Sequence, residues 1–384
     1  MWTFLFWLAV VTLVFVLGTI VEFAVGNRSL SHLKNVAPFQ DNPAPKVSVV
    51  VAARNEARKI EAALRSLLTQ DYPNLEFIFI DDRSTDETAT ILDRLANKDA
   101  RIHVVRIMEL PQGWLGKNHA QHFGAERATG QLILFTDADV IMEPSVISRA
   151  IAYLHREQID HLAITPQLRM PGLLLGMFGG TFALFFGLYA KPWKARDPKS
   201  PRHIGIGAFN LVRTEAYRTV GGHQAIAMRP DDDMKLGKLL KKHGFHQDLL
   251  LSDGLITVEW YSSMGELIHG LEKNTFAGVE YSLAIVVASS IAQFAVFIWP
   301  LLALAFTHGA IWWLNLAIVA SLVILYMDNA YCHGAKRWHC VGFPVTALLF
   351  QYIIWRATLL TLVNNGIDWR GTHYSLQELK ANKL

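Results

Sequence analysis

Hydrophobic and polar positions alternate along the middle of the chain in blocks that predict strands and helices in turn. Apolar runs typical of buried strands cover residues 47–53, 75–80, 102–107 and 132–135. Helical spacing follows three of these runs. The first helix covers residues 57–68, the second runs from a cap at Ser84 or Thr85 to about Leu95, and the third ends near Ala128. This alternation predicts an α/β fold, a mostly parallel and Rossmann-like sheet with helices on both faces.

Long apolar stretches lie on either side of this region. Residues 2–25 are long enough to cross a bilayer, and Arg28 and Lys34 follow them, which by the positive-inside rule places the next domain in the cytoplasm. Further candidate spans cover residues 284–306, 311–331 and 341–363. Whether three or four segments cross is left open, because positive charges flank the last one on both sides.

These patterns divide the chain into five parts. They are an N-terminal transmembrane helix (1–26), a linker (27–46), a catalytic domain (47–282), C-terminal transmembrane helices (283–364) and a tail (365–384). Inside the catalytic domain, residues 171–191 are almost without charge but rich in glycine, which weakens a helix. We expect them to form an interfacial or re-entrant segment, with a buried core helix as the alternative.

Composition narrows the protein class. Hydrophobic residues make up 52% of the 384 positions and charged residues 18%, which fits an integral membrane protein. The formal net charge of +3 is too small to indicate a nucleic-acid partner. Two cysteines, Cys332 and Cys340, do not form a disulfide framework of the kind found in secreted domains.

Polar side chains follow three of the predicted strands, at the point where each strand ends. They are Asn55 and Glu56, Asp81 and Asp82, and Asp137 and Asp139. Because carboxyl ends of parallel strands meet at one edge of a sheet, we expect these groups to share a site. Paired carboxylates suit a hard divalent cation that takes its other ligands from water and phosphate oxygens, although an isolated Asp-x-Asp is as often an ordinary turn.

A second acidic group lies further along the chain. Asp231, Asp232 and Asp233 precede a helical stripe that begins at Leu236. Carboxylates in a first helical turn are stabilised by the helix dipole, but three in a row exceed what capping needs. We therefore treat this triplet as a candidate for a role beyond helix capping.

These motifs resemble the inverting family 2 glycosyltransferases of GT-A fold. The nearest likeness is to membrane enzymes that glycosylate lipids, of the carotenoid-acid, hopanoid-associated and ceramide types. The resemblance rests on residues 53–56 and 81–86, the block 113–120, the Asp137-Ala138-Asp139 motif, the acidic pair before Leu236, and the tail 369–374. It covers nearly the whole chain and implies transfer of one sugar from a nucleotide, with a UDP-sugar as the favoured donor, to a lipid in the cell membrane.

The resemblance also implies a role for particular residues. Asp233 is the expected base, with Asp232 as the alternative within the triplet. Asp139 and Asp137 are the expected ligands of Mg²⁺ or Mn²⁺. The expected nucleotide-sugar contacts are Ala53, Asn55, Glu56, Asp81, Asp82, Lys117, Asp137 and Gly207. Acceptor or membrane-side contacts are assigned to Trp114, Lys273, Asn274, Trp369 and Arg370.

Two departures from the family pattern bear on function. The acidic pair usually begins with Glu, whereas this chain has three Asp. The Gln-x-x-Arg-Trp motif of processive synthases does not occur after the base, which argues against a polymerase. A synthase of short polysaccharides and an inactive, sugar-nucleotide-binding membrane protein remain the competing interpretations.

Overall fold

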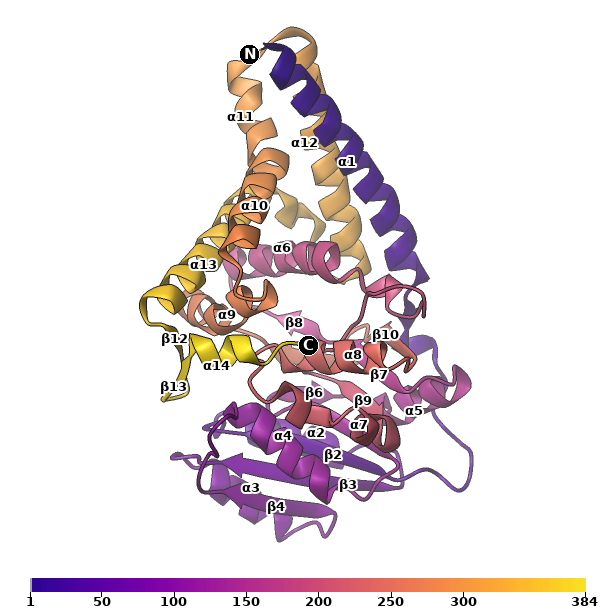
Figure 1. The fold of residues 1–384 in the computed structure, drawn as a ribbon. Coiled ribbons are helices and arrows are strands. Elements are labelled where there is room, and N and C mark those ends of the chain that lie inside the picture. The colour runs from indigo at the N-terminus through magenta and orange to yellow at the C-terminus, as the bar shows by residue number, and fades with distance from the viewer. Residues whose placement is uncertain (1) are drawn as a thin grey trace. The chain divides into compact units, whose positions relative to one another are not determined.

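The computed structural model describes residues 2–384 and divides the chain into two compact units. Unit 1 comprises the chain up to Ser29, Met170–Lys191 and Tyr261–Ile367. Unit 2 comprises Leu30–Arg169, Pro192–Trp260 and Asp368–Leu384. Figure 1 follows the chain through both units by colour, and each unit is described in turn.

Unit 2 is built on an eight-stranded sheet. Its strands lie in the order β1 (Ser31–His32), β10 (Gln247–Leu251), β7 (His161–Thr165), β9 (Asn210–Arg213), β5 (Leu132–Asp137), β2 (Val47–Ala53), β3 (Leu75–Asp82) and β4 (Ile102–Ile107). β9 runs antiparallel to both of its neighbours, and the other pairs are parallel. The predicted mostly parallel α/β sheet is therefore confirmed.

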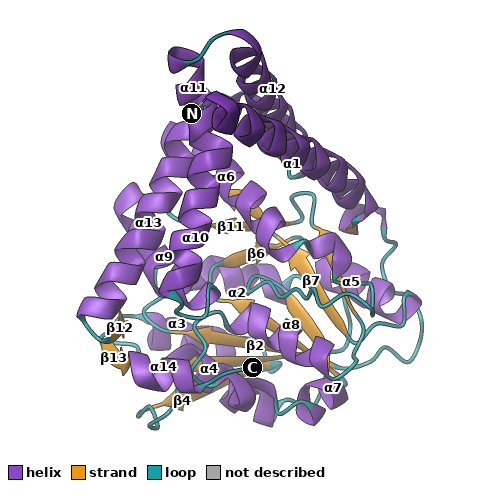
Figure 2. Cartoon of the chain, turned by 45° about the horizontal axis from the view of Figure 1, so that its top comes forward, coloured by secondary structure: helices purple, strands orange, loops and turns teal. Residues whose placement is uncertain are grey.

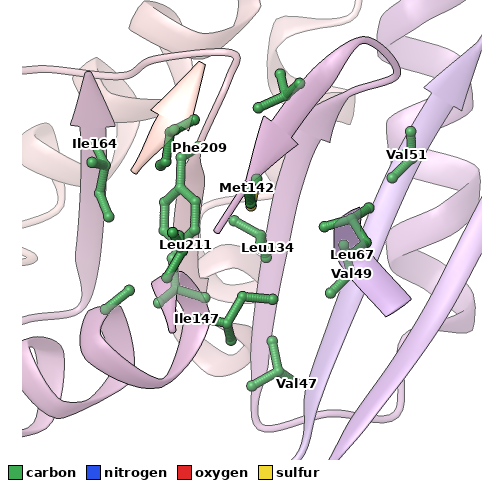
Figure 3. Packing of buried hydrophobic residues seen from close by; sticks show 14 of the residues in the cluster. Val47, Val49, Val51, Leu67, Leu134, Met142, Ile147, Ile164, Phe209 and Leu211 are labelled. Carbon is green, nitrogen blue, oxygen red and sulfur yellow. The ribbon is translucent and has the colours of Figure 1, made fainter. Parts of the chain in front are cut away.

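Alternate residues of the central strands enter two different hydrophobic cores. Val47, Val49 and Val51 of β2 join one core, and Val50 joins the other, as the period of two along a strand requires. Figure 3 shows the first core from close by, with the three β2 valines in line along their strand. Both faces of the sheet are thus covered, which explains why β2 reads as one continuous apolar run.

Each core receives its own helices. The first is packed by α2 (Ile60–Leu68), α3 (Thr88–Ala96) and α5 (Val146–Arg156), and the second by α4 (Gly116–Arg127), α7 (Thr214–Thr219) and α8 (Asp232–Lys242). Figure 2 shows these helices in purple around the orange strands. A small sheet of β6 (Val140–Met142), β11 (Ile256–Glu259) and β8 (Gln167–Arg169) adds to this unit.

Several boundaries differ from the sequence-based expectation. The linker expected over 27–46 is partly structured, because β1 pairs with β10 and the 3₁₀ turn η1 (Leu33–Asn35) follows it. The cap expected at Ser84 or Thr85 is wrong, since α3 begins after Glu87 and those side chains serve a neighbouring loop instead. Residues 261–282, expected in the catalytic domain, belong to unit 1.

Unit 1 is helical. It contains α1 (Trp2–Ser29), α6 (Leu173–Ala190), α9 (Met264–Gly278), α10 (Leu283–Gln293), the π-helical η4 (Phe294–Ile298), α11 (Trp299–Phe306), α12 (Gly309–Cys332), the short η5 (Arg337–Gly342) and α13 (Phe343–Val363). Five helical stretches within residues 2–384 are long and apolar enough to cross a membrane, and one of them is Leu173–Lys194. Figure 1 draws α6 across the direction of α1 and α12.

The glycines of α6 allow it to pack closely across α1 and α12. Gly187 faces the ring of Phe23 in α1, and Gly180 faces the hydroxyl of Tyr326 in α12, each closer than a Cβ atom would permit. Small residues at such contacts let helices approach closely. The glycines that weaken this segment as an isolated helix are therefore the residues through which it packs.

The C-terminal tail returns to unit 2. It forms a hairpin of β12 (Gly366–Trp369) and β13 (Thr372–Ser375), followed by α14 (Leu376–Ala381), which begins with a capping box between Ser375 and Glu378. Beyond α14, the Asn382 side chain accepts from Met228 N at 3.0 Å and donates to Ala225 O at 3.0 Å. The end of the chain is thereby attached to the segment that precedes α8.

Candidate functional site

The strand ends that carry the predicted site residues meet at one edge of the sheet in unit 2. In the register of β2 with its neighbours, Ala53 lies opposite Asp81 of β3, and Ala52 lies opposite Asp137 of β5. The two carboxylates therefore flank the carboxyl end of β2. This is the convergence that the alternating pattern predicts.

Hydrogen bonds connect the loops that follow β2 and β3. Asn55 adopts a positive φ of 55° and accepts from Thr85 N at 2.8 Å through its side chain, while its own N–H donates to Ser84 Oγ at 3.1 Å. Glu56 N donates to Thr88 Oγ1 at 2.8 Å. Asn tolerates the left-handed region better than most residues, which suits it to this turn. These two loops thus form one wall of the site.

Asp82 is held in a buried ionic cluster. Arg83 donates to it through Nε at 2.7 Å and Nη2 at 3.1 Å, and Arg54 Nη1 lies 4.0 Å from its Oδ2. A Cβ on Gly116, the first residue of α4, would lie 2.6 Å from Asp82 Oδ2. Asp82 therefore lies closely against the start of α4, whereas Asp81 accepts from Ser84 N at 3.3 Å.

Each carboxylate of the Asp137-Ala138-Asp139 motif has a lysine beside it. Lys117 Nζ lies 3.0 Å from Asp137 Oδ1, and Lys59 Nζ lies 3.1 Å from Asp139 Oδ2. Burial, together with the charge of Asp137, raises the pKa of Asp139 in spite of Lys59. Two carboxylates that repel one another and attract cations are a donor set that suits a divalent metal.

Lys117 also reaches the second acidic group, with Nζ 3.3 Å from Asp232 Oδ2. Burial alone would lower the pKa of this ammonium group, but the charges of Asp137, Asp232 and Asp233 outweigh it and raise the pKa. Lys117 is thus a permanent positive charge between the two acidic groups.

Asp233 lies in the first turn of α8 with its carboxylate aimed at the segment before β9. Its Oδ2 accepts from Gly207 N at 2.8 Å, and its Oδ1 accepts from Met234 N at 2.8 Å. Burial and the neighbouring Asp232 raise the pKa of Asp233 to about 7, although Lys117 opposes the shift. A carboxylate with such a pKa is matched to proton transfer near neutral pH.

Asp231 has a structural partner instead. The guanidinium of Arg229, which is only 1% exposed, donates to Asp231 Oδ1 at 3.1 Å, and Lys235 Nζ lies 3.4 Å from Asp231 Oδ2. A buried guanidinium needs a counter-charge. Asp231, the first carboxylate of the triplet, therefore compensates a buried cation.

Two glycines bring α8 against the segment before β9. A Cβ on Gly205 would lie 1.9 Å from Asp233 O, and a Cβ on Gly237 would lie 1.8 Å from Ile204 O. The buried side chain of Gln247 links α8 to the same segment, because it accepts from Ile204 N at 2.7 Å and donates to Gly237 O at 2.9 Å. We call this contact of Gly205, Gly237 and Gln247 the α8 dock.

Gly207 connects the two acidic groups. Its N–H donates to Asp233, and a Cβ added to it would lie 2.8 Å from Asp137 Oδ2. The carboxylate at the end of β5 and the carboxylate of α8 are therefore separated by the backbone of a single glycine. The sequence assigned Gly207 to the nucleotide-sugar contacts, and the structure adds that it aligns Asp233.

The predicted acceptor-side residues fall in different parts of the chain. Arg370, in the turn of the tail hairpin, donates through Nη2 to Glu56 Oε1 at 2.7 Å and through Nη1 to Arg54 O, so it contacts the loop after β2. Trp114 stacks on His122 with ring centroids 5.0 Å apart. Lys273 and Asn274 belong to α9 of unit 1, and Trp369 ends β12, so their acceptor role stays a prediction.

Sequence reasoning missed Lys59 and the α8 dock. Lys59 lies five residues after Arg54 in an ordinary amphipathic segment, and only the return of β11 brings Glu259 O within 2.7 Å of its Nζ. Gly205 and Gly237 are 32 positions apart, so nothing local relates them. The spacing of Gly237 four residues after Asp233, on one helix face, was the available indication.

Known proteins match parts of this sequence. Residues 48–221 match the description Glycosyl transferase family 2. An uncharacterized glycosyltransferase of Haemophilus influenzae is 35% identical over 118 residues, which are 31% of this chain and 35% of that protein. The 4,4'-diaponeurosporenoate glycosyltransferase of Staphylococcus haemolyticus is 23% identical over 60% of this chain and 61% of its own length. The chain thus spans about a third and about three fifths of these two relatives.

A solved structure shares the fold. The mannosyltransferase PcManGT from Pyrobaculum calidifontis, in complex with GDP-Man and Mn²⁺, matches with a TM-score of 0.55 and 20% sequence identity. The match covers 94% of this chain and 99% of that chain. It supports the GT-A-like arrangement of sheet and helices.

Proposed function

Since residues 48–221 form a glycosyl transferase family 2 domain, we propose that this glycosyltransferase moves a single sugar from a nucleotide-sugar donor to a membrane lipid, with inversion at the anomeric carbon. One observation carries the proposal. Gly207 lies beside both Asp137, a candidate donor-side group, and Asp233, a candidate base. Its N–H donates to Asp233 Oδ2 at 2.8 Å, and a Cβ added to it would lie 2.8 Å from Asp137 Oδ2. Donor activation and acceptor deprotonation can therefore occur at neighbouring points.

The donor is expected to bind along the edge formed by β2, β3 and β5. Asp81 would accept a hydrogen bond from the nucleobase or ribose, and Lys117 would pair with a phosphate as a point charge. Asn55 and Glu56 would contribute through the loop that Arg370 holds. These contacts would suit nucleotide-sugars in general, and a UDP-sugar is the favoured donor.

The residues present fit a divalent cation. Asp139 and Asp137 offer oxygen ligands, and the raised pKa of Asp139 reflects burial and repulsion that a cation would relieve. Within residues 2–384 there is no cluster of three or more metal-ligating side chains, which fits a cation that takes its remaining ligands from phosphate and water. Bound Mg²⁺ or Mn²⁺ would neutralise charge on the leaving diphosphate.

Asp233 is the proposed base. Gly207 N–H fixes one carboxylate oxygen, and a pKa near 7 lets the group accept a proton from an acceptor hydroxyl or carboxyl group. A single base acting opposite the leaving group fits an inverting displacement. General bases contribute about 10²–10⁴-fold to rate. Asp232, paired with Lys117, is assigned to holding that lysine in place.

The division of the chain into two units supports a defined arrangement in the membrane, and this arrangement agrees with a lipid acceptor. Leu30–Arg169, Pro192–Trp260 and Asp368–Leu384 fold into one unit, so these segments should share one side of the membrane. Among the described residues, α6 is the one candidate span between the first two segments, and an even number of crossings requires that it not cross. The same rule allows only an even number of crossings among the three candidate spans between the last two segments, and we propose that α10–α11 and α12 cross as a hairpin while α13 does not.

Under this proposal three segments cross the membrane, and the tail lies on the same side as the rest of unit 2. The S. haemolyticus relative is named for diaponeurosporenoate, which agrees with an apolar acceptor for this chain. Arg28 and Lys34 behind α1 favour the cytoplasmic side for unit 2. The proposed localisation is therefore the cell membrane, with catalysis on its cytoplasmic face.

The proposal is tested by incubating purified protein in lipid nanodiscs with UDP- and GDP-sugars and extracted membrane lipids. Mass spectrometry should detect lipids heavier by one sugar residue. The Asp233→Asn variant is the matched control, and it should give almost no product. Products carrying a ladder of sugars would favour the short-polysaccharide synthase, and nucleotide binding without product from any lipid would favour the inactive protein.

A further inference from the structure

A lysine outside the proposed catalytic groups occupies the place where a cation would approach Asp139. We propose that Lys59 holds this place until the donor arrives, so that the divalent cation binds tightly only together with the nucleotide. The proposal rests on the metal use in the proposed function. It adds an order of binding and a residue responsible for that order.

The position of Lys59 is determined on two sides. Its Nζ lies 3.1 Å from Asp139 Oδ2 and donates to the backbone oxygen of Glu259 at 2.7 Å. Its side chain is 19% exposed, and it immediately precedes the first residue of α2. Glu259 O is a fixed acceptor at the end of β11, so the ammonium group is held beside Asp139 by a second partner that does not depend on the carboxylate.

A divalent cation would compete directly with this ammonium group. Mg²⁺ and Mn²⁺ bind oxygen ligands at about 2.0–2.2 Å, closer than an ammonium group approaches, so Asp139 Oδ2 cannot serve both in the observed geometry. Lys117 beside Asp137 adds a further positive charge to the same motif. A cation alone would therefore have to displace Lys59 from Asp139, and this displacement would lower its affinity.

The nucleotide changes this balance. Its diphosphate provides oxygen ligands for the cation and negative charge for Lys59, whose flexible stem lets the ammonium group move from Asp139 to a phosphate. Cation and nucleotide should then raise each other's affinity by the same factor, since binding coupling is reciprocal. Couplings of this kind are typically about 5–150-fold.

Neighbouring Arg58 supplies a matched control. Its Nη2 lies 3.2 Å from Glu259 Oε1, and its side chain is 65% exposed. Arg58 thus shares the β11 partner and the charge of Lys59, but it pairs with the Glu259 carboxylate and not with the Asp137-Ala138-Asp139 motif. Lys59→Met and Arg58→Met remove one charge each at adjacent positions while keeping an unbranched apolar stem.

The test measures binding in the full-length protein without turnover. Electron paramagnetic resonance titration gives the affinity for Mn²⁺ alone, and calorimetry gives the affinities for UDP and GDP with and without Mn²⁺. In the wild type, Mn²⁺ alone should bind weakly and should tighten the binding of one nucleotide at least about tenfold. In Lys59→Met, Mn²⁺ alone should bind about tenfold more tightly and the coupling should shrink, while Arg58→Met should match the wild type.

The outcomes separate this proposal from the proposed function. Equal Mn²⁺ affinities in wild type, Lys59→Met and Arg58→Met, with coupling retained, would overturn the role of Lys59 and leave the metal site intact. A tightening in both variants would also overturn it, because a general change of charge would then suffice. Failure of every protein to bind Mn²⁺, even with a nucleotide, would overturn the metal site itself and the Lys59 proposal with it.

Discussion

Gly237→Ala should impair catalysis through the position of Asp233, although it adds only one methyl group four residues away. The new Cβ would lie 1.8 Å from Ile204 O, whereas ordinary contact begins at 3.4 Å, so about 1.6 Å must open between α8 and the segment before β9. Ile204 O is a backbone atom, and Gln247 attaches both sides of the contact. No flexible side chain is available to absorb the shift.

The expected magnitude follows from that displacement. The hydrogen bond from Gly207 N to Asp233 Oδ2 is 2.8 Å long, and a hydrogen bond lengthened beyond about 3.5 Å is largely lost. A misplacement of about 1 Å in a catalytic group costs about 10²-fold in rate. Overpacking should also lower the free energy of unfolding by about 1–3 kcal/mol. Donor affinity should change little, because the groups of β2, β3 and β5 stay in place.

The assay compares initial rates of sugar transfer, donor affinity by calorimetry and thermal unfolding for Gly237→Ala, Gly205→Ala and Gly265→Ala. A Cβ added to Gly265 on α9 would have no neighbouring atom within 4 Å, so its variant controls for the change from glycine to alanine. Gly205→Ala disturbs the same close contact between α8 and the segment before β9. The double variant should therefore be little less active than the less active of the two single variants. A folded Gly237→Ala protein with a rate within about twofold of wild type would refute the reasoning.

The site supports four further predictions. Asp233→Asn should lower transfer by about 10²–10⁴-fold with nucleotide affinity kept, and the wild-type rate should fall as pH drops below about 7, because the pKa of Asp233 is raised and only its deprotonated form is a base. EDTA should abolish transfer and Mn²⁺ or Mg²⁺ should restore it, and Asp139→Asn should weaken metal-dependent nucleotide binding in calorimetry. Arg370→Ala should raise the donor KM more than it lowers kcat, measured by steady-state kinetics, because Arg370 holds the loop after β2. Cysteines at Arg169 and Lys199, in a background without Cys332 and Cys340, should label from the same side of sealed vesicles.

Each of these predictions has a contradicting result. Near-normal turnover of Asp233→Asn would place the base elsewhere, with Asp232 the next candidate, and a flat rate between about pH 5 and 8 would remove the titration. Full activity after complete metal removal would end the metal role of Asp139. An unchanged donor KM in Arg370→Ala would leave the tail contact without a part in donor binding. Labelling from opposite sides would mean that α6 crosses the membrane.

The fold of unit 2 was predictable because its strands are buried on both faces. Apolar runs such as 47–53 coincide with observed strands, and the polar groups at their ends identify the shared edge of the sheet. The Asp137-Ala138-Asp139 and Asp232–Asp233 motifs are local, so their residues could be assigned before their contacts were visible. What patterns of this kind predict are elements and the residues at their ends.

Contacts between distant segments were beyond that reasoning. β1 has only two residues and pairs with β10 more than 200 positions later, so no periodicity distinguishes it from a linker. The role of Asp231 depends on the burial of Arg229, and the role of Lys59 depends on a backbone oxygen of β11. The glycines of α6 indicated a weak helix, although in the folded protein they allow close packing against α1 and α12.

The position of the antiparallel strand β9 in the sheet determines when the sheet can be completed during translation. β9 is inserted between β5 and β7, yet it is translated after both of them and after α6. From the end of β5 at Asp137 to the start of β9 at Asn210 there are 73 residues, which a ribosome adds in about 4–15 s at roughly 5–20 residues per second. During that interval the edge of β5 that later pairs with β9 has no partner, although α6 has already been translated. A chain interrupted shortly before Asn210 would therefore expose an apolar strand edge and be prone to aggregation.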